Sequence, residues 1–286
     1  MLKSLDKIAL VACSDGLKNN ISDNIANLIK ILKDMGLNPV LSPSLYEFNN
    51  HSYSAYDRAN DLINFYQDQD IKAIFDISGG DLSNEILDYL DFDIIKSNYK
   101  PFFGYSDLTV ILNSLYSKNK TINYNYQLRN LINDNGQIQI NRFKNFIINE
   151  EQDLFNFDYT FINGNEIDGI VLGGNIRCLL KLSGTKYMPN FNNSILFLEA
   201  QSGNYNKIST YITQLKQLGI FNSISGLILG TFTEFESKKE NGKIEELFIN
   251  TLKKLNIKNL PIIKTTELGH GSNSKAIPIG GHIRIV

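Results

Sequence analysis

Apolar positions along the first 123 residues recur with two different periods, one typical of buried strands and one of amphipathic helices. Residues 7–12 (KIALVA) are apolar almost throughout, as in a parallel strand that is covered on both faces. From residue 21 to residue 32 the apolar positions follow helical spacing. Further strands are predicted at 38–42 and 72–77, and further helices at 55–66 and 81–90. This alternation predicts an α/β domain with a mostly parallel sheet over residues 1–123.

Residues 100–118 (KPFFGYSDLTVILNSLYSK) are predicted to form a short strand, a sharp turn and a helix. The apolar face of this helix is formed by Leu108, Ile111, Leu112 and Leu115. Ser106 lies at the turn, where a hydroxyl is lifted clear of both elements at the positive end of the helix, as in hydrolases that present a serine nucleophile. The second glycine of the G-x-S-x-G motif is absent, and this stretch taken alone favours Ser106 as a helix N-cap, because Ser and Asp are preferred helix starters.

The periodic pattern weakens between residues 124 and 165, which are rich in Asn, Asp and aromatic residues. We expect an irregular connector there, with room for a pair of strands. Regular patterning resumes afterwards and ends with a glycine-rich loop and two short strands. Residues 166–286 are therefore predicted to form a second, smaller α+β domain.

Composition narrows the choice of function. The chain has 286 residues, enough for two domains with ample cores. A net charge of −2 and a pI near 6.0 give no electrostatic reason to expect nucleic acid or an anionic membrane as partner. The 2 cysteines provide neither a disulfide framework nor a four-cysteine zinc site.

The N-terminal residues 10–13 (LVAC) resemble a lipoprotein cleavage box. However, the uncharged apolar run covers only 8–12 and follows Asp6 and Lys7, whereas export signals need an apolar core of about 7–15 residues. No other stretch approaches the roughly 18 apolar residues of a membrane span. The chain is therefore expected to be cytoplasmic.

A serine nucleophile requires a base, and the chain has 3 histidines. His51 and His282 fit a solvated loop and a strand edge, whereas His270 lies between two glycines in a polar loop, where a substrate can approach closely. An orienting acid is suggested by Glu199, because it ends an apolar strand, where an unpaired charge is costly. A strand-end carboxylate turned to water is the alternative for Glu199, and an ordinary loop residue is the alternative for His270.

Taken together, Ser106, Glu199 and His270 supply a nucleophile, an orienting acid and a base. An imidazole must remove the proton of the serine hydroxyl, and a carboxylate must fix the tautomer of that imidazole.

The oxyanion formed on the attacked carbonyl needs hydrogen-bond donors. The backbone amide of Asp107 is one candidate, and that of Gly79 or Gly80, in the turn after the neighbouring strand, is another. The chain carries no dinucleotide-binding, phosphate-loop, H-E-x-x-H or C-x-x-C motif.

Several segments together resemble one known family. GYSDLTVI, SGGDLSNEIL, LGGNIRCLLKLSGTKYMP, ILFLEA and LGHGSNSKAIPIGG are similar, in order and spacing, to segments of the serine LD-carboxypeptidases and their relatives, the microcin C self-immunity peptidases. The resemblance implies that Ser106 is the nucleophile, Glu199 the orienting acid and His270 the base. It also implies a homodimer without cofactor or metal. Its two branches act on murein tetrapeptides and on a peptidyl-nucleotide antibiotic.

The chain departs from the family pattern at three places. Ser78 stands where the carboxypeptidase branch usually has an arginine, a natural partner for a substrate carboxylate. Residues 123–127 (NYNYQ) replace a Gly-Pro segment, and Ala200 replaces a common second acid. Three hypotheses follow: a carboxypeptidase acting on murein-derived peptides, an immunity-like peptidase acting on aminoacyl or peptidyl nucleotides, and a catalytically silent ligand-binding protein.

Overall fold

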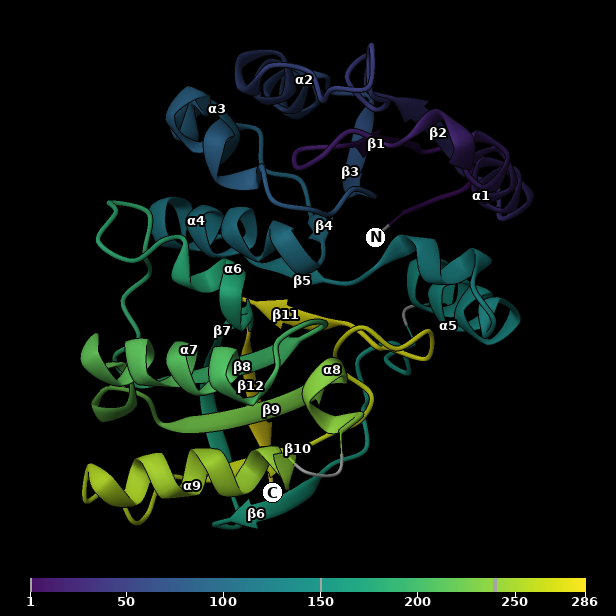
Figure 1. The fold of residues 1–286 in the computed structure, drawn as a ribbon. Coiled ribbons are helices and arrows are strands. Elements are labelled where there is room, and N and C mark those ends of the chain that lie inside the picture. Colours follow the sequence, from purple (N-terminus) through teal and green to yellow (C-terminus); the bar gives the residue numbers. More distant parts are fainter. Residues whose placement is uncertain (1, 150, 239–240) are drawn as a thin grey trace.

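Two six-stranded sheets organise the chain in the computed structural model, which describes residues 2–149, 151–238 and 241–286 (Figure 1). The strands of the first sheet are, in spatial order, β11 (Ile277–Ile279), β5 (Asn123–Asn125), β4 (Phe102–Gly104), β3 (Ile71–Asp76), β1 (Lys7–Val11) and β2 (Asn38–Leu41). The five strands from β5 to β2 are parallel, and β11 pairs antiparallel with β5. The predicted parallel α/β domain is confirmed.

The helices of this half follow the predicted alternation. They are α1 (Ser22–Asp34), α2 (Ala55–Gln67), α3 (Phe92–Ser97) and α4 (Thr109–Asn119), with a 3₁₀ helix η2 (Ser83–Tyr89). The side chain of Ser54 caps α2 by accepting a hydrogen bond from the amide of Asp57. Ala59 and Leu62 of α2 are buried in the core, as the apolar spacing predicts.

The second sheet has a parallel centre and antiparallel edges. Its strands are, in spatial order, β12 (His282–Ile285), β7 (Ile167–Asn175), β8 (Ser194–Ala200), β9 (Gly226–Phe232), β10 (Ile262–Lys264) and β6 (Thr160–Asn163). Its helices are α6 (Ile176–Leu180), α7 (Tyr205–Gln217), α8 (Thr233–Glu236) and α9 (Ile244–Lys254). None of the helices in the described part of the chain is both long and apolar enough to cross a lipid bilayer.

Helix α4 differs from the amphipathic helix that its apolar spacing predicts. Besides the predicted apolar residues, its polar positions Thr109, Asn113 and Ser114 are also fully buried. The reason is its place in the fold: α4 contacts β4 and β5 of the first sheet as well as α6 and β7 of the second half (Figure 1). Its polar side chains are satisfied by backbone groups; Asn113, for example, bonds to Gly173 of β7.

The prediction of an irregular connector over 124–165 is wrong for its central part, because α5 (Gly136–Asn149) lies there. The helical pattern is hard to see because Gln139 is fully buried, whereas Ile138 is 52% exposed. The Gln139 amide donates hydrogen bonds to the carbonyls of Ser272 and Ser274, so a polar residue occupies a core position. Tertiary hydrogen bonds thus replace the apolar stripe on which sequence patterns depend.

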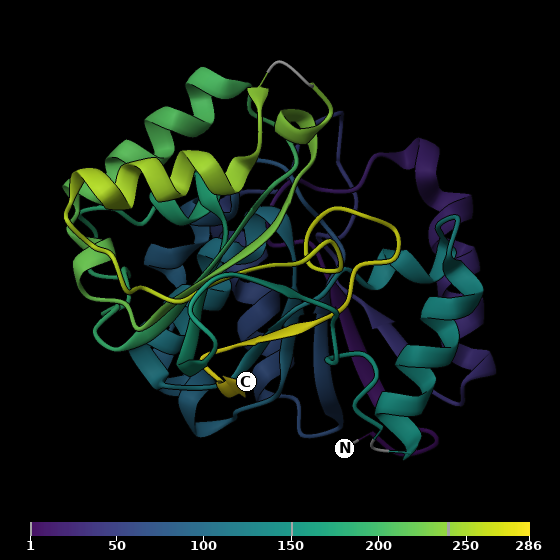
Figure 2. The ribbon, with the colours of Figure 1, turned by 90° about the horizontal axis from the view of Figure 1, so that it is seen from below.

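The two halves share structure at the end of the chain. The segment after β10 leaves the second sheet, adds β11 to the first sheet and returns as β12 to the second. In Figure 2 the yellow loop that precedes β11 lies between the green part of the chain and the purple-to-teal part. A single apolar core also joins α2 and α4 of the first half to β7, β8 and β9 of the second.

Candidate active site

Ser106 lies at the turn between β4 and α4, where the sequence places it. Its φ angle is +55°, a left-handed conformation that costs a non-glycine residue roughly 1–2 kcal/mol. The turn begins at Gly104, where an added Cβ would lie 2.7 Å from the Cβ of Leu108. The Ser106 hydroxyl caps neither the short 3₁₀ helix η3 (Ser106–Leu108) nor α4, so the N-cap interpretation is wrong. Strain of this kind is typical of functional sites.

His270 lies in the loop between β10 and β11, next to the Ser106 turn. Its Nε2 is 3.1 Å from Ser106 Oγ. The flanking Gly269 has a φ of +138° and packs so closely on Thr231 that an added Cβ would lie 2.0 Å from Thr231 Oγ1. The ring of Tyr105 packs on the imidazole with 4.4 Å between ring centroids. The backbone conformation of Gly269 and the packing of the Tyr105 ring therefore position the imidazole.

Glu199 lies near the end of β8 and is completely buried. Its Oε2 is 2.5 Å from His270 Nδ1, and its Oε1 has no hydrogen-bond partner among the described residues. The interpretation of Glu199 as a carboxylate turned to water is therefore wrong. The structure brings Ser106, His270 and Glu199 into one hydrogen-bonded chain.

The other two histidines lie elsewhere. His51 pairs with Phe48 in an exposed backbone bridge, and Nε2 of the exposed His282 on β12 lies 2.8 Å from an oxygen of Asp168. Neither lines the cavity that contains Ser106.

The side chain of Asp107 is fully buried and holds the backbone after Ser106 in place. Its carboxylate accepts hydrogen bonds from Ser14 Oγ (2.7 Å), the Ser83 amide (2.9 Å) and Lys181 Nζ (2.5 Å). Burial by itself would raise the pKa of Asp107, but these donors, Lys181 foremost, lower it below its usual value. The sequence offered only the amide of Asp107 for a role; this side-chain network was missed.

A cavity of about 550 Å³ opens at Ser106 and His270. Its other lining residues include Gly79, Gly80, Tyr105, Gln127 and Arg129, together with Asp15, Lys18, Glu47 and Ser78. Gly79 forms an isolated antiparallel bridge with Asp15, whose amide donates to the Gly79 carbonyl at 3.2 Å. None of the described residues accepts a hydrogen bond from the backbone amides of Gly80 or Asp107. At Gly80 an added Cβ would lie 2.2 Å from the Asp15 carboxyl carbon, so only glycine fits there.

Arg129 in this cavity was not singled out by the sequence. It belongs to a short 3₁₀ helix η4 (Leu128–Ile132) that directly follows the departing segment 123–127. A lone arginine in an asparagine-rich stretch is the only signal that the sequence offers. The sequence does not show that Arg129 lines this cavity or that its Nε is buried without a hydrogen-bond partner.

No group of three or more His, Cys, Asp or Glu side chains in the described part of the chain is arranged to hold a metal ion. Cys13 and Cys178 are free and buried, and burial raises the pKa of both thiols. Neither cysteine lines the cavity at Ser106.

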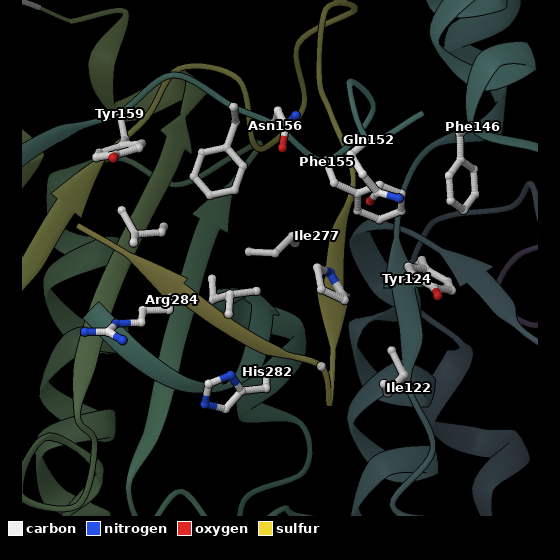
Figure 3. A pocket seen from close by; sticks show the side chains of 15 residues that line it. Ile122, Tyr124, Phe146, Gln152, Phe155, Asn156, Tyr159, Ile277, His282 and Arg284 are labelled. Atoms are coloured by element: carbon white, nitrogen blue, oxygen red, sulfur yellow. The ribbon is translucent and has the colours of Figure 1, made fainter. Parts of the chain in front are cut away.

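A second groove of about 630 Å³ lies between β5 and β12 and is shown in Figure 3. Tyr124, Phe146 and Phe155 lie on one side of it, and Tyr159 and Arg284 on the other. None of Ser106, Glu199 and His270 lines this groove. Its mainly aromatic and aliphatic surface offers no nucleophile with an adjacent base.

A serine, a histidine and a carboxylate in one hydrogen-bonded chain, with the serine on a strand-to-helix turn, is the arrangement found in triad hydrolases. Comparison with known proteins identifies the family. Residues 8–126 match the LD-carboxypeptidase N-terminal domain and residues 168–285 match the LD-carboxypeptidase C-terminal domain. The chain belongs to the LD-carboxypeptidase family, which confirms the resemblance seen in the sequence.

Individual relatives are distant but cover most of the chain. A putative carboxypeptidase of Treponema pallidum is 25% identical, covering 100% of this chain and 91% of its own. The microcin C7 self-immunity protein MccF of Escherichia coli is 25% identical, covering 80% of this chain and 75% of its own. The crystal structure of an MccF-like protein from Bacillus anthracis is 28% identical with a TM-score of 0.86, covering 100% of this chain and 94% of its own.

Proposed function

We propose that this protein is a serine carboxypeptidase that hydrolyses the amide bond before a terminal D-amino acid in murein-derived peptides. The observation that carries the proposal is the continuous contact from Ser106 Oγ to His270 Nε2 and from His270 Nδ1 to Glu199 Oε2, at 3.1 Å and 2.5 Å. Membership of the LD-carboxypeptidase family supports the reaction class.

In the proposed mechanism His270 Nε2 removes the proton of the Ser106 hydroxyl while Oγ attacks the amide carbon. Glu199 accepts the hydrogen bond of Nδ1–H, fixes the tautomer and stabilises the imidazolium. The imidazolium then gives its proton to the leaving amine as the C–N bond breaks, which leaves an ester on Ser106. A water molecule, deprotonated by the same imidazole, hydrolyses that ester and restores the hydroxyl.

The oxyanion of each tetrahedral intermediate is proposed to bind the amide of Asp107 together with that of Gly80 or Gly79. These groups line or adjoin the cavity at Ser106. The amides of Asp107 and Gly80 donate to no described residue, whereas Gly79 is paired with Asp15 in a backbone bridge. Loss of one such donor costs about 2.7–4 kcal/mol in comparable sites.

A second candidate is a peptidase that cleaves the amide of aminoacyl or peptidyl nucleotides. It is favoured by the similarity to MccF, a protein whose structure is known in complex with aspartyl sulfamoyl adenosine. Rates on a murein tetrapeptide and on aspartyl sulfamoyl adenosine, measured side by side, decide between the two. Faster hydrolysis of the tetrapeptide would support the carboxypeptidase, and faster hydrolysis of the adenosine compound would support the immunity-like peptidase.

The test of the shared mechanism is labelling with a serine-directed fluorophosphonate, followed by mass spectrometry. Wild type should be labelled at Ser106, and Ser106→Ala should lose both the label and, by a factor on the order of 10⁶, the turnover. An unlabelled wild type would support the third hypothesis, a catalytically silent ligand-binding protein. A Ser106→Ala variant within tenfold of wild-type turnover would exclude the triad mechanism.

The homodimer is part of the proposal because it accompanies the family resemblance, and the cytoplasmic location because the sequence suggests neither an export signal nor a membrane span. The homodimer predicts a mass near twice the 32.4 kDa of the chain by light scattering. Cell fractionation tests the location.

A further inference from the structure

Arg129 is a half-buried cation without a protein partner. Its Nε is inaccessible to solvent and has no hydrogen-bond partner, and no side chain in the described part of the chain forms an ion pair with it. Arg58 is a useful comparison, because it is an arginine whose contacts stabilise the fold. Arg58 donates to the carbonyls of Cys13 and Ser14 and forms a 2.6 Å ion pair with Glu85. A buried N–H group without a hydrogen-bond partner costs free energy, so the position of Arg129 Nε needs a reason other than stability.

The carboxylate with the strongest electrostatic effect on Arg129, that of Asp76, is already hydrogen-bonded to other groups. Asp76 is fully buried, and its oxygens accept hydrogen bonds from the Cys13 amide and from both the amide and the hydroxyl of Ser78. Burial lowers the pKa of Arg129, and Asp76 offsets this only in part. The cation therefore stays charged and lacks a contacting anion.

Arg129 faces the cavity at the nucleophile. It lines that cavity with Ser106 and His270, and its charge acts on Tyr105, whose ring packs on the imidazole. Gln127, two positions earlier, lines the same cavity with a buried Oε1 that has no hydrogen-bond partner. The same cavity is thus lined by an unpartnered donor, Arg129 Nε, and an unpartnered acceptor, Gln127 Oε1.

The charges around the cavity indicate which ligand fits. Asp15 and Glu47 also line it and repel an anion from their side, and Asp15 accepts a hydrogen bond from the Asp81 amide. Lys18, the other lining cation, is exposed to solvent, where its charge is screened. Arg129 is therefore the cation of this cavity that is desolvated enough to bind an anion strongly.

We propose that Arg129 binds the free carboxylate of the substrate next to the scissile amide, and that this contact restricts the enzyme to peptides with a free C-terminus. The inference rests on the proposed peptidase function and deepens it. A guanidinium binds a carboxylate through two parallel N–H···O bonds, which fixes the position as well as the charge of the ligand. Gln127 Oε1 then accepts a hydrogen bond from a substrate N–H.

The test uses two ligands, a tetrapeptide that ends in D-alanine and the same peptide as its C-terminal carboxamide. Their binding to the Ser106→Ala protein is measured by calorimetry, because this variant holds the ligand without turning it over. The acid should bind about 100-fold more tightly than the carboxamide, as expected for charge-assisted hydrogen bonds. In Ser106→Ala/Arg129→Met the two affinities should become equal within about threefold.

Two further variants control for charge and folding. Lys18→Met should retain the preference for the acid, because that exposed cation is screened. Arg129→Lys should retain only part of it, because an ammonium cannot form the bidentate contact. Arg129→Met should also melt no lower than wild type, because removing an unpaired, half-buried charge relieves a desolvation cost.

Equal affinity of the acid and the carboxamide for Ser106→Ala would overturn the inference, as would an unchanged preference in the Arg129→Met background. A loss of affinity for aspartyl sulfamoyl adenosine but not for the peptide acid would also overturn it, because the cation would then serve a nucleotide linkage. Fluorophosphonate labelling of wild type tests the peptidase mechanism separately. An Arg129-dependent preference for the acid in a protein that is never labelled would support carboxylate binding by Arg129 and reject the peptidase.

Discussion

Ser106 and His270 are 164 positions apart in the chain, yet Oγ of the one lies 3.1 Å from Nε2 of the other. The contact depends on both sheets. Ser106 follows β4 of the first sheet, whereas the loop of His270 begins after β10 of the second and ends at β11 of the first. The contact between Ser106 and His270 therefore depends on the position of the first sheet relative to the second.

Replacement of Glu199 by Gln should lower kcat by about 10⁴ with little change in KM, because an amide can hold the wrong tautomer of His270. Steady-state kinetics on the tetrapeptide measures this. Glu166→Gln is the matched control, because Glu166 is an exposed carboxylate paired with Arg284. A Glu199→Gln enzyme within tenfold of wild type would show that the 2.5 Å contact with Nδ1 has no catalytic role.

Gly269→Ala should lower kcat by at least about 10², since a displacement near 1 Å of a reacting group has an effect of this size. The added methyl would lie 2.0 Å from Thr231 Oγ1, and the φ of +138° disfavours alanine, so the loop must shift and take His270 with it. Gly184→Ala is the control, because it also has a positive φ but meets no atom within 4 Å. Similar kcat values for the two variants would refute this account of the loop.

Asn113→Ala should lower the free energy of unfolding by about 3 kcal/mol, because both backbone groups of Gly173 are left buried without partners. Asn113 Nδ2 donates to the Gly173 carbonyl at 2.8 Å, and Oδ1 accepts from the Gly173 amide at 2.9 Å. Urea titration measures the change. Asn119→Ala, which removes a single hydrogen bond to the Phe92 carbonyl, should cost about 1 kcal/mol. An equal cost for both variants would contradict the importance of the α4–β7 contact.

Asp107→Asn should weaken the acid sensitivity of the fold. The pKa of Asp107 is lower in the folded protein than in the unfolded chain, where it is about 3.9. The carboxylate therefore stabilises the fold fully above the unfolded pKa, and this contribution is lost as the pH falls through the folded pKa. Urea unfolding at pH values from 6 down to the lowest at which the protein stays folded should give a shallower decline for Asp107→Asn. Parallel curves would exclude Asp107 as a source of acid sensitivity.

The sequence predicted the parts of the fold in which apolar residues determine the structure. The strand at Lys7–Val11 and helix α2 follow from apolar runs and spacing alone. Helix α5 escaped prediction because the buried position at Gln139 is polar and its hydrogen bonds reach Ser272 and Ser274, more than 130 positions away. When the hydrogen-bond partners of a buried polar side chain lie this far away in the chain, the residues around it show no pattern that predicts its burial.

The sequence predicted which residues form the candidate site, but not their backbone conformation or their contacts with distant segments. A serine on a strand-to-helix turn, a histidine between glycines and a glutamate ending an apolar strand each have a physical reason to be noticed. The left-handed φ of Ser106 and the unpartnered state of Arg129 depend on packing between distant segments. Nothing within a few residues of either position encodes them.

The strand β11 has a consequence for any motion of the enzyme. The loop of His270 is tethered at one end to the second sheet through β10 and at the other to the first sheet through β11. A hinge opening between the halves would stretch this loop and pull the imidazole away from either Ser106 or Glu199. An opening between the two halves would therefore disturb the hydrogen-bonded chain from Ser106 through His270 to Glu199.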